Sequence, residues 1–168
     1  MGTLGDVMSP QPAWLPDLIC VDPWCDELVE MLYAVFDIDF RQSKPVFEGR
    51  EIHYFPELRD GGKEVIFWHL ITCEDETRSK RIPEENRAAR LSWVRCLIEN
   101  CAQAEVLYWD YLEHNGDVKT YIWLVEDDFL ILLKRLKDGT RRLLTSFYIE
   151  YESYKGKLQK KYNKRLTQ

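Results

Sequence analysis

A histidine in the middle of a nearly apolar run is the first residue in this sequence that could do acid–base chemistry. His69 lies in EVIFWHLIT, residues 64–72, a run that predicts a central strand. Burial shifts the pKa of an imidazole toward the neutral form, which can accept a proton from a hydroxyl group near physiological pH. The alternative is a core histidine whose ring nitrogens are satisfied by hydrogen bonds.

Arginines follow this histidine closely along the chain. Arg87 and Arg90 are three residues apart on a predicted helix and should share one face, and Arg81 lies in the segment just before it. Guanidinium groups on one face match the oxygens of a phosphate group. The alternative is pairing with nearby acids such as Glu84 and Glu85.

Hydroxyl and aromatic residues mark the last predicted strand, RRLLTSFYIE at 141–150. Thr145 and Ser146 should point to opposite faces of that strand, as should Phe147 and Tyr148. Such a hydroxyl beside aromatic rings can hold a phosphate while a ring stacks on a base. The alternative is a sheet whose outward positions are simply polar. No Asp and His stand at a spacing that would make Ser146 a protease-like nucleophile.

Charge is divided unevenly along the 168 residues, whose formal net charge is −6. Residues 1–133 carry 12 basic and 26 acidic side chains, whereas residues 134–168 carry 11 basic and 3 acidic ones. Local charge sets the field that a polyanion meets, so the basic end predicts RNA contacts that are independent of base sequence. A solvated terminal helix is the alternative. With Arg81, the predicted RNA-binding residues are Arg141, Arg142, Lys155, Lys157, Lys160 and Lys161.

Metal and membrane functions receive little support. The five cysteines contain no C-x-x-C pair and the three histidines are scattered, so we expect no structural metal and no cofactor. Acids at 126–128 and at Asp37 and Asp39 could serve a two-metal nuclease, but a predicted turn and a loop are poor places for that chemistry. No apolar run approaches the roughly 20 residues of a spanning helix, and the N-terminus does not read as a secretory signal. We therefore expect a cytoplasmic protein without a membrane partner.

The elements that must position these residues begin with helices. Residues 1–20 read as an extended arm, and a helix should start at Asp22, with Leu28, Met31, Leu32, Val35 and Phe36 on its buried face. Residues 37–48 read as irregular. A strand at 50–55, a Gly-Gly turn and the strand at 64–72 predict a hairpin. A charged connection then leads to a helix from Pro83 to about residue 100.

Four strands and a terminal helix complete the chain. The strands are predicted at 105–112, 118–126, 128–136 and 141–150, and Asn115-Gly116 and Asp138-Gly139 are strong hairpin turns. Residues 151–165 should form a helix that is interrupted or frayed at Gly156. Helices followed by a run of strands predict an α+β fold, with N-terminal helices packed on an antiparallel sheet that ends in a four-strand meander. Residues 21–168 should form this single domain.

Read together, FWHLIT, RIPEENRAARLSWVR, LLTSFYIE and the Lys-rich end resemble small bacterial and prophage-associated proteins. That group looks like the phage branch of the barnase–EndoU–colicin–RelE-like nucleases, and the resemblance covers Gly49 to Arg165. It implies helices on a four-stranded antiparallel sheet and a metal-independent ribonuclease, often a toxin. By position, His69 matches the catalytic histidine, Arg87 and Arg90 the cationic pair, Thr145 the late-strand hydroxyl and, more weakly, Tyr148 a further site residue. A second histidine, typical of the EndoU branch, has no counterpart.

Three functional hypotheses follow. The first is a ribonuclease in which His69 deprotonates a ribose 2′-hydroxyl while Arg87 and Arg90 stabilise the phosphorane. The second is a non-catalytic module of the same fold that binds a protein or a nucleic acid, because six Trp also suit a large aromatic interface. The third is a nuclease restrained by an immunity or antitoxin protein. The sequence does not indicate an oligomeric state.

Overall fold

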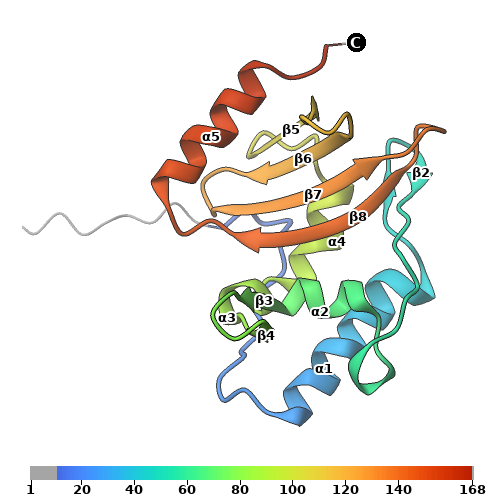
Figure 1. Cartoon of the computed structure of the whole chain (residues 1–168), viewed down its shortest axis with the longest axis vertical. Helices are drawn as coiled ribbons and strands as arrows, with labels where there is room; N and C mark the ends of the chain where they lie inside the picture. Colours follow the sequence, from blue (N-terminus) through green and yellow to red (C-terminus); the bar gives the residue numbers. More distant parts are fainter. Residues whose placement is uncertain (1–10, 168) are drawn as a thin grey trace, which may run out of the picture.

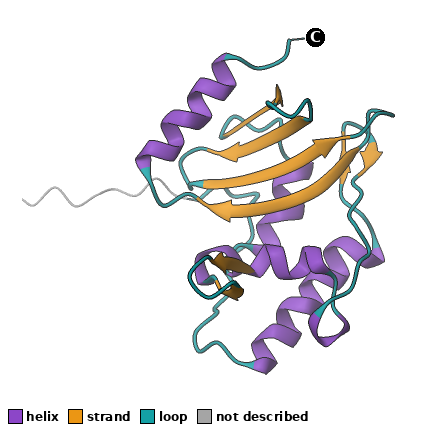
Figure 2. Ribbon diagram, in the orientation of Figure 1, coloured by secondary structure: helices purple, strands orange, loops and turns teal. Residues whose placement is uncertain are grey.

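The computed structural model describes residues 11–167 and has the predicted α+β architecture (Figure 1). A four-stranded antiparallel sheet forms the centre of the molecule, and two short hairpins lie outside it. Helices α2 (Val65–Ile71), α3 (Glu85–Ala88) and α4 (Leu91–Glu99) lie on one side of the sheet, and α1 (Asp26–Phe36) packs on α4. The terminal helix α5 (Glu152–Asn163) covers part of the other face (Figures 1 and 2). Helices on both faces allow the apolar side chains of both faces to be buried.

The meander contains β5 (Val106–Leu112), β6 (Val118–Leu124), β7 (Phe129–Arg135) and β8 (Arg141–Tyr148), paired in sequence order. This prediction is confirmed. Two of its turns depend on glycine, because Gly116 and Gly139 have φ angles of 88° and 86°, a region that residues with a Cβ rarely adopt. Because the strands are paired in sequence order, β8 stands last and is an edge strand of the sheet.

The two faces of the sheet bury different side chains. Ile122, Ile131 and Leu143 face the N-terminal helices, while Trp123 and Leu130 belong to the cluster under α5. Leu133 pairs with Leu143 and Leu132 pairs with Thr145, so a bulge at Leu144 interrupts this alternation once in β8. Beyond the bulge, Thr145 and Ser146 lie on opposite faces of the sheet, as do Phe147 and Tyr148, which agrees with the prediction.

The first helix, α1, spans Asp26–Phe36 and starts four residues later than predicted. Leu28, Leu32 and Phe36 are buried as expected, but Met31 is 42% exposed. The segment expected to be irregular continues as a short π-helix, η1 (Asp37–Gln42), and then as strand β1 (Val46–Phe47). These elements bring α1 against α4 (Leu91–Glu99), the main helix under the sheet.

The prediction of a strand at 64–72 was wrong, because Val65–Ile71 forms helix α2. Its buried residues are Ile66, Phe67, Leu70 and Ile71, two pairs four residues apart that share one helical face. A short apolar run does not by itself distinguish a buried strand from a helix, since both bury most of its side chains. His69 consequently lies on a half-buried helix surface instead of inside a sheet.

The predicted hairpin between 50–55 and 64–72 is also absent from the described residues. Strand β2 is short (Arg50–Glu51) and pairs with β1. Just beyond it, the His53 N–H donates to the Arg141 carbonyl at 2.8 Å and the Leu143 N–H donates to the His53 carbonyl at 2.8 Å. This segment therefore protects the first half of the β8 edge. The Gly-Gly turn contains a 3₁₀ turn, η2 (Asp60–Gly62), and leads into α2.

A hairpin replaces the predicted charged connection. Its strands are β3 (Thr72–Asp75) and β4 (Lys80–Pro83). The helix predicted from Pro83 is divided into α3 (Glu85–Ala88) and α4, with Arg90 at the break. Helices α2 and α3 both pack against β8. This corner of the molecule, the α2–α3–β8 junction, holds most of the residues predicted to do chemistry.

Residues at both ends of the described chain pack against the domain. Residues 1–10 of the predicted arm lie outside the described part, and residues 11–20 pack along α3 and α4. The Ile19 N–H donates to the Ala89 carbonyl at 2.9 Å, and the Trp93 indole donates to the Pro16 carbonyl at 2.8 Å. Helix α5 (Glu152–Asn163) is continuous through Gly156, contrary to prediction. Within residues 11–167, no helix is both long and apolar enough to cross a membrane.

Candidate functional site

Two arginines bind the carbonyl groups at the C-terminal end of α2. Arg87 donates from Nη1 to the carbonyl oxygens of His69 and Thr72, each at 2.8 Å. Arg81 donates from Nη2 to the same Thr72 carbonyl at 2.7 Å and from Nε to the Thr72 hydroxyl at 2.8 Å. Carbonyls at a helix end have no partner within the helix, so these bonds satisfy them. The two cations thereby hold α2, β3 and α3 together.

The two arginines differ in which guanidinium nitrogens lack a hydrogen-bond partner. Arg81 uses Nε and Nη2 on Thr72, and its Nη1 lies 3.8 Å from Glu74. Among residues 11–167, Arg87 makes side-chain hydrogen bonds through Nη1 only, and its Nε is buried without a partner. The Nε–Nη2 edge of a guanidinium is one that can bind two oxygens of an oxyanion. Arg87 is therefore held in place through Nη1, while its buried Nε and its Nη2 have no hydrogen-bond partner within residues 11–167.

His69 lies beside these cations. Burial lowers the pKa of its half-buried imidazole, and the charges of Arg81, Arg59 and Arg87 lower that pKa further. Each effect disfavours the imidazolium, so the ring is neutral at pH 7. Guanidinium groups attract a phosphate, and a neutral imidazole beside them can accept a proton from a hydroxyl group next to that phosphate.

The sequence predicted that Arg87 and Arg90 share one helix face. They do not lie on one helix, because Arg87 is in α3 and Arg90 stands at the break between α3 and α4. Its guanidinium carbon lies 4.4 Å from the ring centroid of Tyr148 and 5.1 Å from that of Trp93. Nη1 donates to the Asn86 carbonyl at 2.8 Å, while Nε is buried without a partner. The fold therefore brings together two predicted site residues, Arg90 and Tyr148.

Thr145 lies on the other face of β8. Thr145 pairs with Leu132, whose side chain packs with the cluster under α5, whereas Tyr148 pairs with Phe129 on the helix side. The Thr145 hydroxyl makes a long hydrogen bond, 3.4 Å, to the Ser146 carbonyl. Thr145 thus shares a strand with Tyr148 but not a face, and the fold does not bring its hydroxyl to the side where Arg90 lies.

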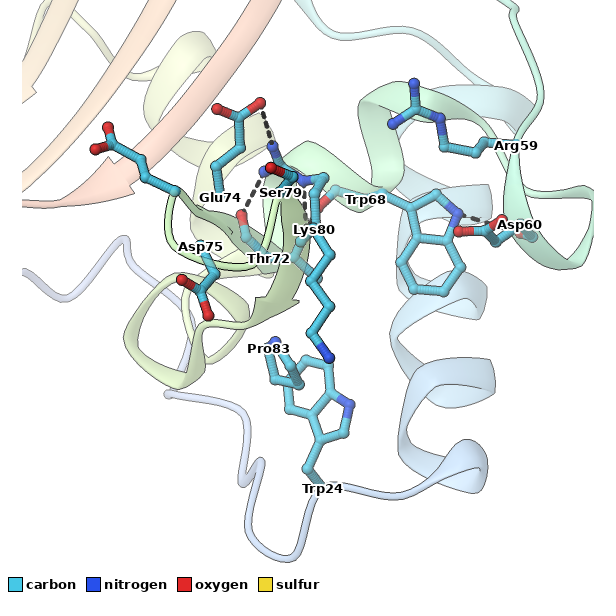
Figure 3. A pocket seen from close by; sticks show the side chains of 12 residues that line it. Trp24, Arg59, Asp60, Trp68, Thr72, Glu74, Asp75, Ser79, Lys80 and Pro83 are labelled. Carbon is cyan, nitrogen blue, oxygen red and sulfur yellow. Dashed lines mark hydrogen bonds and ion pairs between the residues drawn. The ribbon is translucent and has the colours of Figure 1, made fainter.

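A cleft of about 780 Å³ opens next to α2 and has Arg81 among its lining residues. Trp68 and Arg59 lie on one side of it and Glu74 and Asp75 on the other, with Trp24 across the opening (Figure 3). The Trp68 indole is fixed by a 3.2 Å hydrogen bond to the Asp60 carbonyl. The cleft is therefore aromatic and carries both signs of charge. Trp68 and Arg59 were not singled out in the sequence, although Trp68 is the neighbour of His69.

A smaller hollow of about 290 Å³ lies where Arg87 meets the end of β8. Aromatic side chains dominate its lining, which consists of Cys73, Glu84, Arg87, Phe147, Tyr148, Ile149, Glu150, Tyr151 and Tyr154. Because Arg81 lines the cleft, Arg87 lines the hollow and both bind the Thr72 carbonyl, the two cavities flank the end of α2. Tyr151 and Tyr154 were not predicted to be site residues. The sequence signal that could have indicated them is the recurrence of tyrosine every three residues from Tyr148.

Several of the basic residues predicted to bind RNA have acidic partners within the fold. Lys155 pairs with Asp128 at 2.7 Å and with Glu152 at 2.9 Å. Lys161 donates to Tyr121 at 2.7 Å and lies 3.2 Å from Glu113. These contacts neutralise much of the charge that made the terminal helix look like a polyanion site.

The two arginines of β8 are similarly engaged. Arg141 is only 7% exposed; its Nε donates to the Thr120 hydroxyl at 2.8 Å and its Nη2 lies 3.2 Å from Asp110. Arg142 stacks over Phe55, with 3.9 Å between its guanidinium carbon and the ring centroid. Lys157 and Lys160 are exposed on α5 and remain accessible. The predicted basic surface therefore shrinks to a few lysines.

Within the described range 11–167, no three His, Cys, Asp or Glu side chains come close enough to share a metal ion. The acids at 126–128 instead lie in the turn between β6 and β7, where Asp128 pairs with Lys155. Comparisons with protein-family models, with curated proteins and with solved structures find no match for this chain.

Proposed function

We propose that this protein is a cytoplasmic, metal-independent ribonuclease whose active site is the α2–α3–β8 junction. The observation that carries the proposal is the position of Arg87. Its Nη1 is fixed on the carbonyls of His69 and Thr72, its positive charge acts on the His69 imidazole, and its Nη2 makes no hydrogen bond within residues 11–167. A phosphate oxygen would satisfy that donor.

In the proposed reaction, neutral His69 takes the proton of a ribose 2′-hydroxyl. The 2′-oxygen then attacks the adjacent phosphorus, the bond from phosphorus to the 5′-oxygen breaks, and the leaving oxygen takes a proton from solvent. The products are a 2′,3′-cyclic phosphate and a 5′-hydroxyl. The lowered pKa of His69 supports this role, since the ring stays in its proton-accepting form below the usual histidine range.

Arg87 would stabilise the negative charge that builds on the phosphorane, which is the larger electrostatic part of the catalysis. Arg90, held against Tyr148, would contribute a second positive charge, and Arg59 a third. Thr145 would reach only a neighbouring part of the RNA, because its face of β8 differs from that of Tyr148. Lys157 and Lys160 would attract the RNA backbone through salt-sensitive contacts.

The test is incubation of the purified chain with total RNA in EDTA, with His69→Ala as the comparison. We expect cleavage by the wild type and a loss of at least about 100-fold for the variant. His114, an exposed residue in the β5–β6 turn, supplies the matched control His114→Ala, which should cleave like the wild type. Intact RNA with the wild type, or equal cleavage by His69→Ala, would contradict the proposal.

A second candidate function is a non-catalytic binding module, including one that recognises an antitoxin-like protein. The observation that favours it is that Arg81 and part of Arg87 serve the fold itself. Expression in a bacterial host separates the two. Toxicity that Arg87→Ala relieves supports the enzyme, whereas normal growth with stoichiometric co-purification of one protein supports the module.

A further inference from the structure

The hollow beside Arg87 is lined by four aromatic rings from β8 and the start of α5. Phe147 and Tyr154 meet edge to face, with 5.5 Å between their centroids. Arg90 lies over Tyr148 and Arg87 lies 6.0 Å from the Phe147 centroid. These contacts fix three of the four rings, so the hollow is a formed surface and not a gap between mobile side chains.

Tyr151 is the exception among these rings. It is 70% exposed, stands immediately before α5, and no aromatic ring within residues 11–167 stacks on it. An exposed aromatic ring at the rim of an aromatic hollow offers a face on which a planar group can stack. Every nucleobase has such a face.

Arg87 is one of the residues that line this hollow, and its Nη2 makes no hydrogen bond within residues 11–167. A phosphate bound there would leave its own nucleotide within reach of the rings. The volume, about 290 Å³, lies at the lower end of ligand-binding cavities, which suits a single base better than a longer stretch of chain. Glu84 does not compete for the base, since its carboxylate accepts hydrogen bonds from the Asn86 and Arg87 N–H groups.

We propose that this hollow is a base-binding subsite, in which one nucleobase of single-stranded RNA stacks on Tyr151 next to the phosphate bound by Arg87. The proposal rests on the ribonuclease function proposed above for its phosphate site. It adds a substrate class, because a base can enter the hollow only when it is not paired in a duplex. Stacking tolerates all four bases, so the subsite selects single-stranded RNA and not a sequence.

The experiment measures binding without cleavage. In the His69→Ala background, fluorescence anisotropy gives the Kd of a labelled adenosine hexaribonucleotide and of an abasic hexaribose phosphate with the same charge. We expect the hexanucleotide to bind at least about tenfold tighter, and Tyr151→Ala to remove about tenfold of that preference. Tyr151→Phe, which keeps the ring, should retain it. Tyr108→Ala, an exposed tyrosine on the opposite edge strand β5, is the matched control.

An unchanged preference in Tyr151→Ala would overturn the subsite, as would an equal loss in Tyr108→Ala. The ribonuclease proposal is tested separately by the wild-type cleavage assay. Cleavage together with a Tyr151-independent preference removes the subsite alone. A Tyr151-dependent preference without any cleavage removes the enzyme and supports the hollow as a base-binding site.

Discussion

The terminal helix and the α2–α3–β8 junction are both rich in cations, but the two regions use them differently. On α5, Lys155 and Lys161 are held by acidic partners, and these bonds fix the helix to the sheet. At the junction, Arg87 is also fixed, yet only through Nη1. Positive charge by itself therefore does not identify a phosphate site. A cation that is held in place with a donor edge to spare is the more specific sign.

The largest expected effect tests whether the junction is catalytic. His69→Ala removes the proposed base, so the cleavage rate of single-stranded RNA should fall by about 10²- to 10⁴-fold. Circular dichroism and thermal melting should show that the variant is folded. A folded variant that cleaves at the wild-type rate would mean that the junction, like α5, has only a structural role.

The next effect separates Arg87 from Arg81. Arg87→Ala should lower the cleavage rate by about 10²- to 10³-fold, because it removes the group that faces the phosphorane. Arg81→Ala should leave the rate of the folded protein within a few fold and lower the free energy of unfolding by about 1–3 kcal/mol, since it removes two hydrogen bonds to Thr72. Urea unfolding and single-turnover kinetics measure the two quantities. Equal kinetic effects would show that both arginines act only through the fold.

A stability effect should appear on α5. Lys161→Met removes the hydrogen bond to Tyr121, a 3% exposed residue that also donates to Glu113, and should lower the free energy of unfolding by about 1–2 kcal/mol. Lys157→Met changes an exposed position and should stay within about 0.5 kcal/mol. Urea denaturation checks both. An equal effect of the two substitutions would mean that Lys161 does not anchor the helix.

The smallest effect concerns pH. Because the pKa of His69 is lowered by burial and by neighbouring arginines, the rate should stay high below pH 6.5 and fall only as pH passes the lowered value. Arg81→Ala removes one of these charges and should move the acid limb of the pH–rate profile toward higher pH. The same lowered pKa means that stability falls as pH drops below 6.5, since the unfolded chain binds the extra proton first. An unmoved acid limb would indicate another titrating group.

The sheet could be predicted from the sequence because its signals are local. Alternating apolar residues and the turns at Asn115-Gly116 and Asp138-Gly139 determine the strands and their order. The run around His69 could not be assigned in this way, since seven mostly apolar residues suit a helix or a strand equally well. Its fold depends on the neighbours that cover it.

The chemistry of the site was only partly predictable for a related reason. The sequence marks Arg87, Arg90 and Tyr148, and the last two do meet. Which donors of an arginine are used, however, depends on which carbonyls the fold brings to it. The engagement of Lys155 by Asp128 likewise joins a helix to a turn far away in the sequence, and no spacing rule predicts it.

The central claim is that the junction catalyses attack of a ribose 2′-hydroxyl on phosphorus. The most direct measurement uses single-stranded oligonucleotides with one ribonucleotide in a deoxyribonucleotide chain, and mass spectrometry of the products in EDTA. We predict one cut after the ribonucleotide, which leaves a 2′,3′-cyclic phosphate end. His69→Ala should not produce this cut. Cutting of the all-deoxy strand, or a linear phosphate formed directly, would contradict the mechanism.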